Sequence, residues 1–291
     1  MRFRFLSLLL LAISSFGQSQ VVPSSKVTLS EDQIRELISK AADNDMQNDK
    51  QQRNYTYVER QEERRLDGKG QVKSTEVKTY DVMDIYGEQV QKLISKDDQP
   101  LSEKDAKKED EKIQKLIDKR KNESADDRSK RLEKEEKEHE EERKFVKEVS
   151  DAYHFKLAGM EAIDGRDTYV IDCEPRSDFQ PHMKESKFLS KVHGRLWLDK
   201  DDLEMKKLDV EFLETVSFGL FLARIHKGSR VVVENIRVNN EVWLQQHLAV
   251  KVDVRLALLK NFNVEVDVAD SNYKKFGSTT KITTLGEAAQ Q

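Results

Sequence analysis

Histidine and carboxylate side chains are the first candidates for chemistry in this chain. None of the histidines lies in an HExxH motif or in a Cys/His cluster with the spacing of metal ligands. They are His139, His154, His182, His193, His226 and His247. His182 and Glu185 could meet at a metal ion, but histidines in such loops are usually plain surface residues. The sequence also lacks a GxSxG turn, a phosphate-binding loop and a GxGxxG motif. We therefore predict no catalytic residue, no metal site, no cofactor and no enzymatic activity.

Cysteine content and charge narrow the function further. Cys173 is the only cysteine, so it cannot form a disulfide within the chain, and we interpret it as a buried structural thiol rather than a nucleophile. The 55 acidic residues offer no pair that stands out as catalytic. Without Arg2 and Arg4, 49 of the 51 basic residues remain against 55 acidic ones, a net charge of −6. This balance argues against a nucleic-acid partner.

The first residues have the pattern of a secretory signal. Arg2 and Arg4 precede an apolar run from Phe5 to Ile13, and small residues follow near Gly17. We predict residues 1–19 to be a signal peptide, cleaved near Gly17–Ser19, and the mature protein to be periplasmic. An uncleaved anchor remains the alternative. No later segment approaches the roughly 20 apolar residues that a membrane-spanning helix needs.

The clearest structural signal is a strict alternation from Val242 to Leu258. Eight of the nine even positions are apolar, whereas the odd positions include Lys251 and Asp253. A period of two is typical of a strand with one apolar and one solvated face, and therefore of an antiparallel sheet. Burying eight such side chains contributes roughly 1.5–3 kcal/mol each. Helices of the protein itself or a ligand must therefore cover this face.

The N-terminal part predicts a helix followed by strands. Ser30 and Gln33 form a capping-box pattern, and apolar residues recur at helical spacing to about 47. Residues 54–66 and 71–82 flank the turn Asp67–Gly70 and predict a hairpin, with 84–95 as a third strand.

A highly charged stretch interrupts the strands at 101–150. It contains no Gly or Pro, and Glu or Asp repeatedly precedes Lys or Arg at helical spacing. Ser124 and Asp127 can cap a new helix after a break near Asn122. We predict two helices, or one long arm, standing away from the body. The arm is either a solvated spacer or a contact surface for a partner protein.

Strands return from Tyr153 onward. The expected strands are 153–159, 167–174, 188–199, 203–216, 230–238, 242–258 and 262–268. The apolar segment 217–225 breaks the alternation and is interpreted either as a connection packed in the core or as a flap over a pocket. The tail 277–291 is predicted to be loose.

These elements resemble a known family. The signal, the capped helix, the hairpin, DGRDTYVIDCEP at 164–175 and GRLWLDKDD at 194–202 are similar to the periplasmic lipoprotein carriers LolA and LolB. The sigma-factor regulators RseB and MucB share that fold. The resemblance implies a mainly β fold: a curved antiparallel sheet, or incomplete barrel, with the N-terminal helix on its concave apolar face. It covers 30–100 and 151–276, with 101–150 as an insertion.

The resemblance leads to a functional hypothesis. We expect a non-enzymatic carrier or binder of lipoprotein acyl chains or another lipid. The alternative is an envelope interaction or sensor module that uses residues 101–150 for a protein partner. The candidate ligand-binding residues are Leu196, Leu198, Val210, Phe212, Phe218, Phe221, Leu248, Val250, Val252, Val254 and Leu256.

Overall fold

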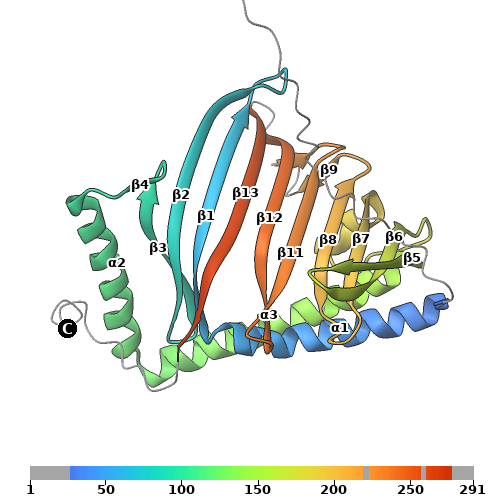
Figure 1. Cartoon of the computed structure of the whole chain (residues 1–291), viewed down its shortest axis with the longest axis horizontal. Helices are drawn as coiled ribbons and strands as arrows, with labels where there is room; N and C mark the ends of the chain where they lie inside the picture. The colour runs from blue at the N-terminus through green and yellow to red at the C-terminus, as the bar shows by residue number, and fades with distance from the viewer. Residues whose placement is uncertain (1–26, 219–222, 257–259, 277–291) are drawn as a thin grey trace, which may run out of the picture.

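The computed structural model describes residues 27–218, 223–256 and 260–276 (Figure 1). The helices are α1 (Glu31–Gln52), α2 (Glu103–Lys121), α3 (Ala125–Ala152) and the short 3-10 helix η1 (Glu185–Lys191). The strands are β1 (Tyr55–Leu66), β2 (Val72–Ile85), β3 (Glu88–Lys96), β4 (Gln99–Pro100), β5 (Tyr153–Ile163), β6 (Arg166–Pro175), β7 (Val192–Asp199), β8 (Met205–Phe212), β9 (Val216–Phe218), β10 (Ala223–Ile225), β11 (Arg230–Val238), β12 (Val242–Leu256) and β13 (Lys260–Lys275).

All strands belong to one curved, unclosed antiparallel sheet of 13 strands, which confirms the predicted fold class. The order is β4-β3-β2-β1-β13-β12-β11-β8-β7-β6-β5, and β9 and β10 form a side branch on β12. The strand at the C-terminal end of the sequence therefore lies in the middle of the sheet, beside β1 (Figure 1). Successive hairpins explain most neighbours, but the β1–β13 pair joins the two parts of the chain on either side of the insertion.

Helix α1 starts as its sequence predicts. The Ser30 hydroxyl accepts from the Gln33 N–H, and the Gln33 side chain accepts from the Ser30 N–H, so both halves of the capping box are present. At the other end, the Asn48 side chain donates to the Trp243 carbonyl (2.7 Å) and accepts from the Trp243 N–H (2.9 Å). These two bonds fix the last turns of α1 to β12.

The main core lies between α1, the end of α3 and the strands β5–β7. Ile34, Ile171 and Leu198 are at most 1% exposed there. Phe145 and Val149 of α3 pack against the same cluster. We call the face of the sheet that carries α1 the inner face and the opposite face the outer face. In Figure 1, α1 and α3 cross one end of the strands, and the strands extend well beyond them.

The charged insertion forms the two predicted helices, with the break at Asn122 and a new cap at Ser124. The prediction that it stands away from the body is wrong. Ile113 of α2 is only 4% exposed, and Glu109 accepts from the Leu93 N–H of β3 (3.3 Å). The few apolar residues at the ends of the stretch are enough to dock both helices, because each helix needs to bury only one short stripe.

The alternation along β12 is interrupted once. Glu234 pairs with His247 but Asn235 pairs with Gln245, so β12 carries one extra residue there. Such a bulge reverses which side chains point inward. The prediction of one continuous apolar face from Val242 is therefore wrong, and Val242 and Leu244 are buried in a separate cluster with Tyr55.

Several predictions fall outside the described residues: the signal at 1–19, the tail at 277–291 and the middle of the 217–225 segment. The ends of that last segment form the short hairpin β9–β10, which pairs with the end of β12. None of the helices that the structure describes is long and apolar enough to cross a membrane.

Candidate functional site

An apolar row crosses the inner face of the sheet at one level. Directly paired residues share a face, so the register defines the row without ambiguity. Its members, in spatial order, are Leu157, Ile171, Leu196, Leu208, Val233, Leu248 and Val268. At β1 the row turns polar, because Val268 pairs with Gln61. The inner face thus has an apolar region with a polar border at β1.

A second row continues this apolar surface towards the far end of the strands. Val210, Val231, Val250 and Val266 lie side by side, and β12 and β13 extend the surface with the pairs Val252–Val264 and Val254–Phe262. These side chains are only half-buried, whereas Ile171 and Leu198 under α1 are fully buried. Cover by the helices therefore ends partway across the sheet. We call these eight residues of β8, β11, β12 and β13 the apolar surface.

The predicted ligand-binding residues divide into three groups. Val210, Val250, Val252 and Val254 belong to the apolar surface, and Leu248 lies in the adjoining row. Leu196 packs at the edge of the core, Leu198 is 0% exposed within it, and Phe212 is 7% exposed in a cluster with Val192 and Val216. The third group is Phe218, Phe221 and Leu256. The side chains of Phe218 and Leu256, and all of Phe221, lie outside what the structure describes.

The outer face of the same strands is polar. His247 Nε2 lies 2.8 Å from an Asp267 oxygen, and Lys207 donates to Glu234 (2.7 Å). Lys251 pairs with Glu265 at 3.0 Å. The two faces therefore differ sharply, as the alternation predicts for this part of β12.

Two buried carboxyl groups lie on the inner face, two residues beyond Val268 on β13 and its partner Gln61 on β1. Glu59 of β1 and Asp270 of β13 are directly paired, and they are 7% and 6% exposed. Burial raises the pKa of Asp270 to about 7, the Glu59 charge adds to this rise, and a hydrogen bond from Gln245 opposes it. Burial likewise raises the pKa of Glu59, against a hydrogen bond from Gln61.

Sequence reasoning missed this pair, although one signal was present. Phe262, Val264, Val266 and Val268 alternate along β13, and Asp270 occupies the next inward position. A carboxyl group in line with an apolar ladder needs either a partner or a proton. Its facing partner Glu59 could not be deduced, because the β1–β13 pairing is long-range.

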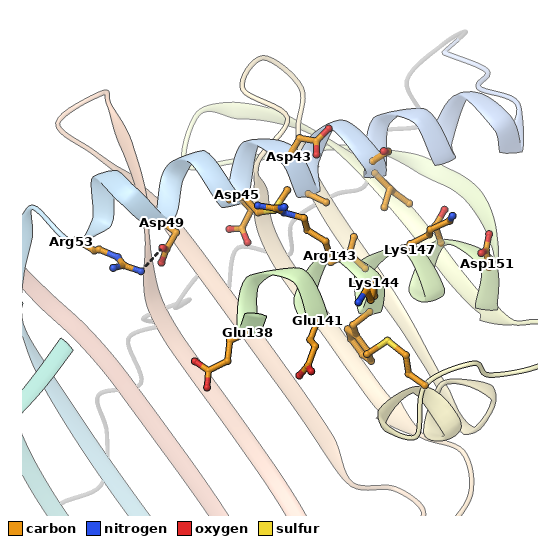
Figure 2. A pocket seen from close by; sticks show the side chains of 18 residues that line it. Asp43, Asp45, Asp49, Arg53, Glu138, Glu141, Arg143, Lys144, Lys147 and Asp151 are labelled. Carbon is orange, nitrogen blue, oxygen red and sulfur yellow. Dashed lines mark hydrogen bonds and ion pairs between the residues drawn. The ribbon is translucent and has the colours of Figure 1, made fainter. Parts of the chain in front are cut away.

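A large groove lies elsewhere, between α1 and α3 (Figure 2). Its volume is about 1500 Å³. Acidic and basic side chains from both helices line it, and Asp49 pairs with Arg53 at 3.1 Å. The charged lining residues are Asp43, Asp45, Asp49, Arg53, Glu138, Glu141, Arg143, Lys144, Lys147 and Asp151. Apolar side chains line the same groove, so its lining is mixed: Ile38, Ala42, Met46, Phe145, Val146 and Met183.

Metal and thiol chemistry have little support in the described part of the chain. There, no three His, Cys, Asp or Glu side chains are grouped so that they could hold a metal ion. Burial raises the pKa of the Cys173 thiol to about 12, which keeps it in the unreactive neutral form.

Comparison with known proteins gives distant structural matches. A putative outer membrane lipoprotein-sorting protein domain from Vibrio parahaemolyticus is 10% identical, with 84% of this chain and 95% of that chain covered and a TM-score of 0.34. A LolA superfamily protein from Nitrosomonas europaea is 12% identical, with 87% and 95% covered and a TM-score of 0.30. The MucA/MucB complex of Pseudomonas aeruginosa matches at 11% identity, 82% and 100% coverage and a TM-score of 0.20.

The sequence itself matches no family model and no curated protein. The structural matches include both kinds of protein that the sequence resembles, lipoprotein-sorting proteins and MucB. Their TM-scores indicate a distant likeness, so the site's own geometry has to carry the functional argument.

Proposed function

We propose that the protein binds and carries an acyl chain, of a lipoprotein or another lipid, on the apolar surface of its sheet. The observation that carries this proposal is the change in burial across one continuous inner face. In the β5–β7 part, Ile171 and Leu198 are fully buried against the protein's own helices, whereas the valines of the apolar surface on β11, β12 and β13 are only partly buried. A contiguous apolar patch that remains accessible to solvent typically marks a binding site.

The mechanism is desolvation of the chain against branched side chains. Each buried methylene contributes about 0.8 kcal/mol, so a long acyl chain gains enough from a surface of this kind to bind without a specific polar contact. Binding requires no covalent step, which fits the proposal of a non-enzymatic carrier. Export to the periplasm by the signal at 1–19 belongs to the same proposal.

The test is acyl binding by the chain without residues 1–19. Organic extracts of the gently purified protein should contain lipid by mass spectrometry, and a fluorescent acyl probe should bind saturably to the lipid-free protein. Val252→Asp places a carboxylate in the centre of the apolar surface and should lower the affinity of the probe by at least about tenfold. The matched control is Val232→Asp on the outer face of β11, beside Ala249.

Unchanged probe affinity in a folded Val252→Asp variant, or no saturable binding by the wild type, would contradict the proposal. The second result would favour the other candidate, a module that binds an envelope protein through residues 101–150. The charged α1–α3 groove is the observation that supports that candidate. A pull-down with the groove variants Lys144→Glu and Lys147→Glu would then identify the binding face.

A further inference from the structure

The buried pair Glu59–Asp270 lies on the same inner face as the apolar surface, separated from it along β13 by the buried Val268. Asp270 follows Val268 by two residues on β13, and Glu59 precedes Gln61, the partner of Val268, by two residues on β1. In a strand, side chains two residues apart share a face. Both carboxyl groups therefore lie on the inner face, one step beyond the last apolar row.

The four carboxyl oxygens of the pair outnumber the side-chain N–H donors that contact them. Gln245 Nε2 donates to Asp270 Oδ2 (3.1 Å), whereas Asp270 Oδ1 is buried without a hydrogen-bond partner among the residues that the structure describes. Glu59 accepts from Gln61 (2.6 Å) and Gln91 (2.8 Å), both on Oε1. No ion pair among the described residues includes either carboxyl group. A buried acceptor without a donor is costly, so the arrangement is incomplete as it stands.

A positive group is what this arrangement lacks. Two carboxylates at directly paired positions repel each other, and burial strengthens the repulsion. The rings of Tyr57 and Tyr273 have centroids 5.9 Å apart. Burial raises the pKa of both phenols, and they lie close enough to Asp270 for its charge to add to this rise. Such rings can also contact a cation. A calcium ion fits poorly, because it takes six to eight oxygen ligands and only two carboxyl groups meet here. A primary ammonium brings three donors in a compact group and suits a few acceptor oxygens.

We propose that Glu59 and Asp270 bind the cationic amine head group of the ligand whose acyl chain lies on the apolar surface. This inference rests on the proposed function and specifies its ligand class as a cationic amphiphile. The eight residue steps from Asp270 back to Phe262 span about 26 Å along β13, which gives a long tail room beside the valines. The amine donates to Asp270 Oδ1 and to the Glu59 carboxylate, and its charge replaces the proton that Asp270 otherwise keeps.

The test compares three amphiphiles with the same tail: dodecylamine, dodecanol and dodecanoate. Each competes with the fluorescent acyl probe for the lipid-free protein at neutral pH and physiological salt. Charge-assisted hydrogen bonds to a buried pair should make dodecylamine bind roughly tenfold to a hundredfold more tightly than dodecanol. Dodecanoate should bind most weakly, because its charge repels both carboxyl groups.

Variants of Glu59 and Asp270 test whether this pair causes the preference for dodecylamine over dodecanol. Asp270→Asn, alone and together with Glu59→Gln, should abolish the preference for the amine and leave the affinity for dodecanol unchanged. The control Asp267→Asn, three residues away on the outer face, should keep the preference. Both side-chain amides are neutral and close in shape to the acids they replace, so the fold should survive, which far-UV circular dichroism checks.

The outcomes separate the two proposals. Equal binding of dodecylamine and dodecanol to the wild type, as expected if the pair only shares a proton, would overturn the head-group inference and leave the carrier proposal standing. An amine preference that persists in the Asp270→Asn, Glu59→Gln double variant would also overturn it. Failure of all three amphiphiles to displace the probe would instead count against the acyl site itself.

Discussion

Replacing Asp270 by Asn should make the protein more stable at neutral and alkaline pH. The side chain is 6% exposed, and burial raises its pKa to about 7 from an ordinary value of 3.8. Below about 3.8 the group is protonated in both the folded and the unfolded chain. Between 3.8 and 7 only the folded chain keeps the proton, so unfolding releases it and rising pH favours the unfolded chain. The stability contributed by the protonated group is therefore lost as the pH rises to about 7.

The size of the effect follows from that interval. At 1.36 kcal/mol for each pKa unit, the loss above pH 7 reaches at most about 4 kcal/mol. Asparagine is neutral at every pH, and its side-chain carbonyl can still accept from Gln245. We therefore expect the stability difference between Asp270→Asn and the wild type to be near zero at about pH 4 and to grow to about 2–4 kcal/mol at about pH 8.

Urea unfolding of the lipid-free protein, followed by circular dichroism at several pH values, measures this difference. Asp167→Asn on β6 is the control, because its side chain is 63% exposed and the change should have little effect at any pH. A difference between Asp270→Asn and the wild type that stays constant with pH, or that grows as the pH falls, would refute the reasoning.

Three further predictions concern the docking of α2, the loop that Glu148 holds and the burial of the Cys173 thiol. Ile113→Ala removes the buried contact of α2 and should lower the free energy of unfolding by about 2–4 kcal/mol, whereas Leu132→Ala at the 50% exposed site on α3 should change it by less than about 0.5 kcal/mol. Glu148 accepts from the N–H groups of His182 (2.9 Å) and Met183 (2.7 Å), so Glu148→Ala should cost about 1–3 kcal/mol and make the following loop easier to cleave by protease, while equal stability and cleavage would contradict this role. Cys173 should react with iodoacetamide at pH 8 only in urea, and rapid labelling of the folded protein would show that the thiol is not buried as described.

The secondary structure was largely predictable because its signals are local. The capping box at Ser30, the second cap at Ser124 and the turn at Asp67–Gly70 each act within a few residues, and all three are present. Most strands fall close to their predicted bounds for the same reason, since period-two alternation needs no distant partner. Two differ: β13 continues to Lys275 instead of ending at 268, and residues 188–191 belong to η1 instead of a strand. The main disagreement, the bulge near Gln245, comes from the pairing of β12 with β11 and is invisible in either strand alone.

The site was predictable only in part. Alternation identified Val250, Val252 and Val254 as residues of one apolar face, and the register places them together. Alternation does not show which part of that face the protein's own helices bury. Leu198 and Phe212 were therefore predicted to contact the ligand, although the protein's own core buries them. Burial by a helix depends on where that helix docks, and helix docking is a long-range contact.

The sequence by itself determined the antiparallel strands, the capped helices and the existence of an apolar face, because spacing and turn residues act over short distances. Only the tertiary structure decided which strands lie in the middle of the sheet, how far α1 and α3 cover it, and that Glu59 faces Asp270. The physical reason is that strand pairing joins segments far apart in the chain. Many partners satisfy the same local pattern, and the packing of the whole sheet selects one.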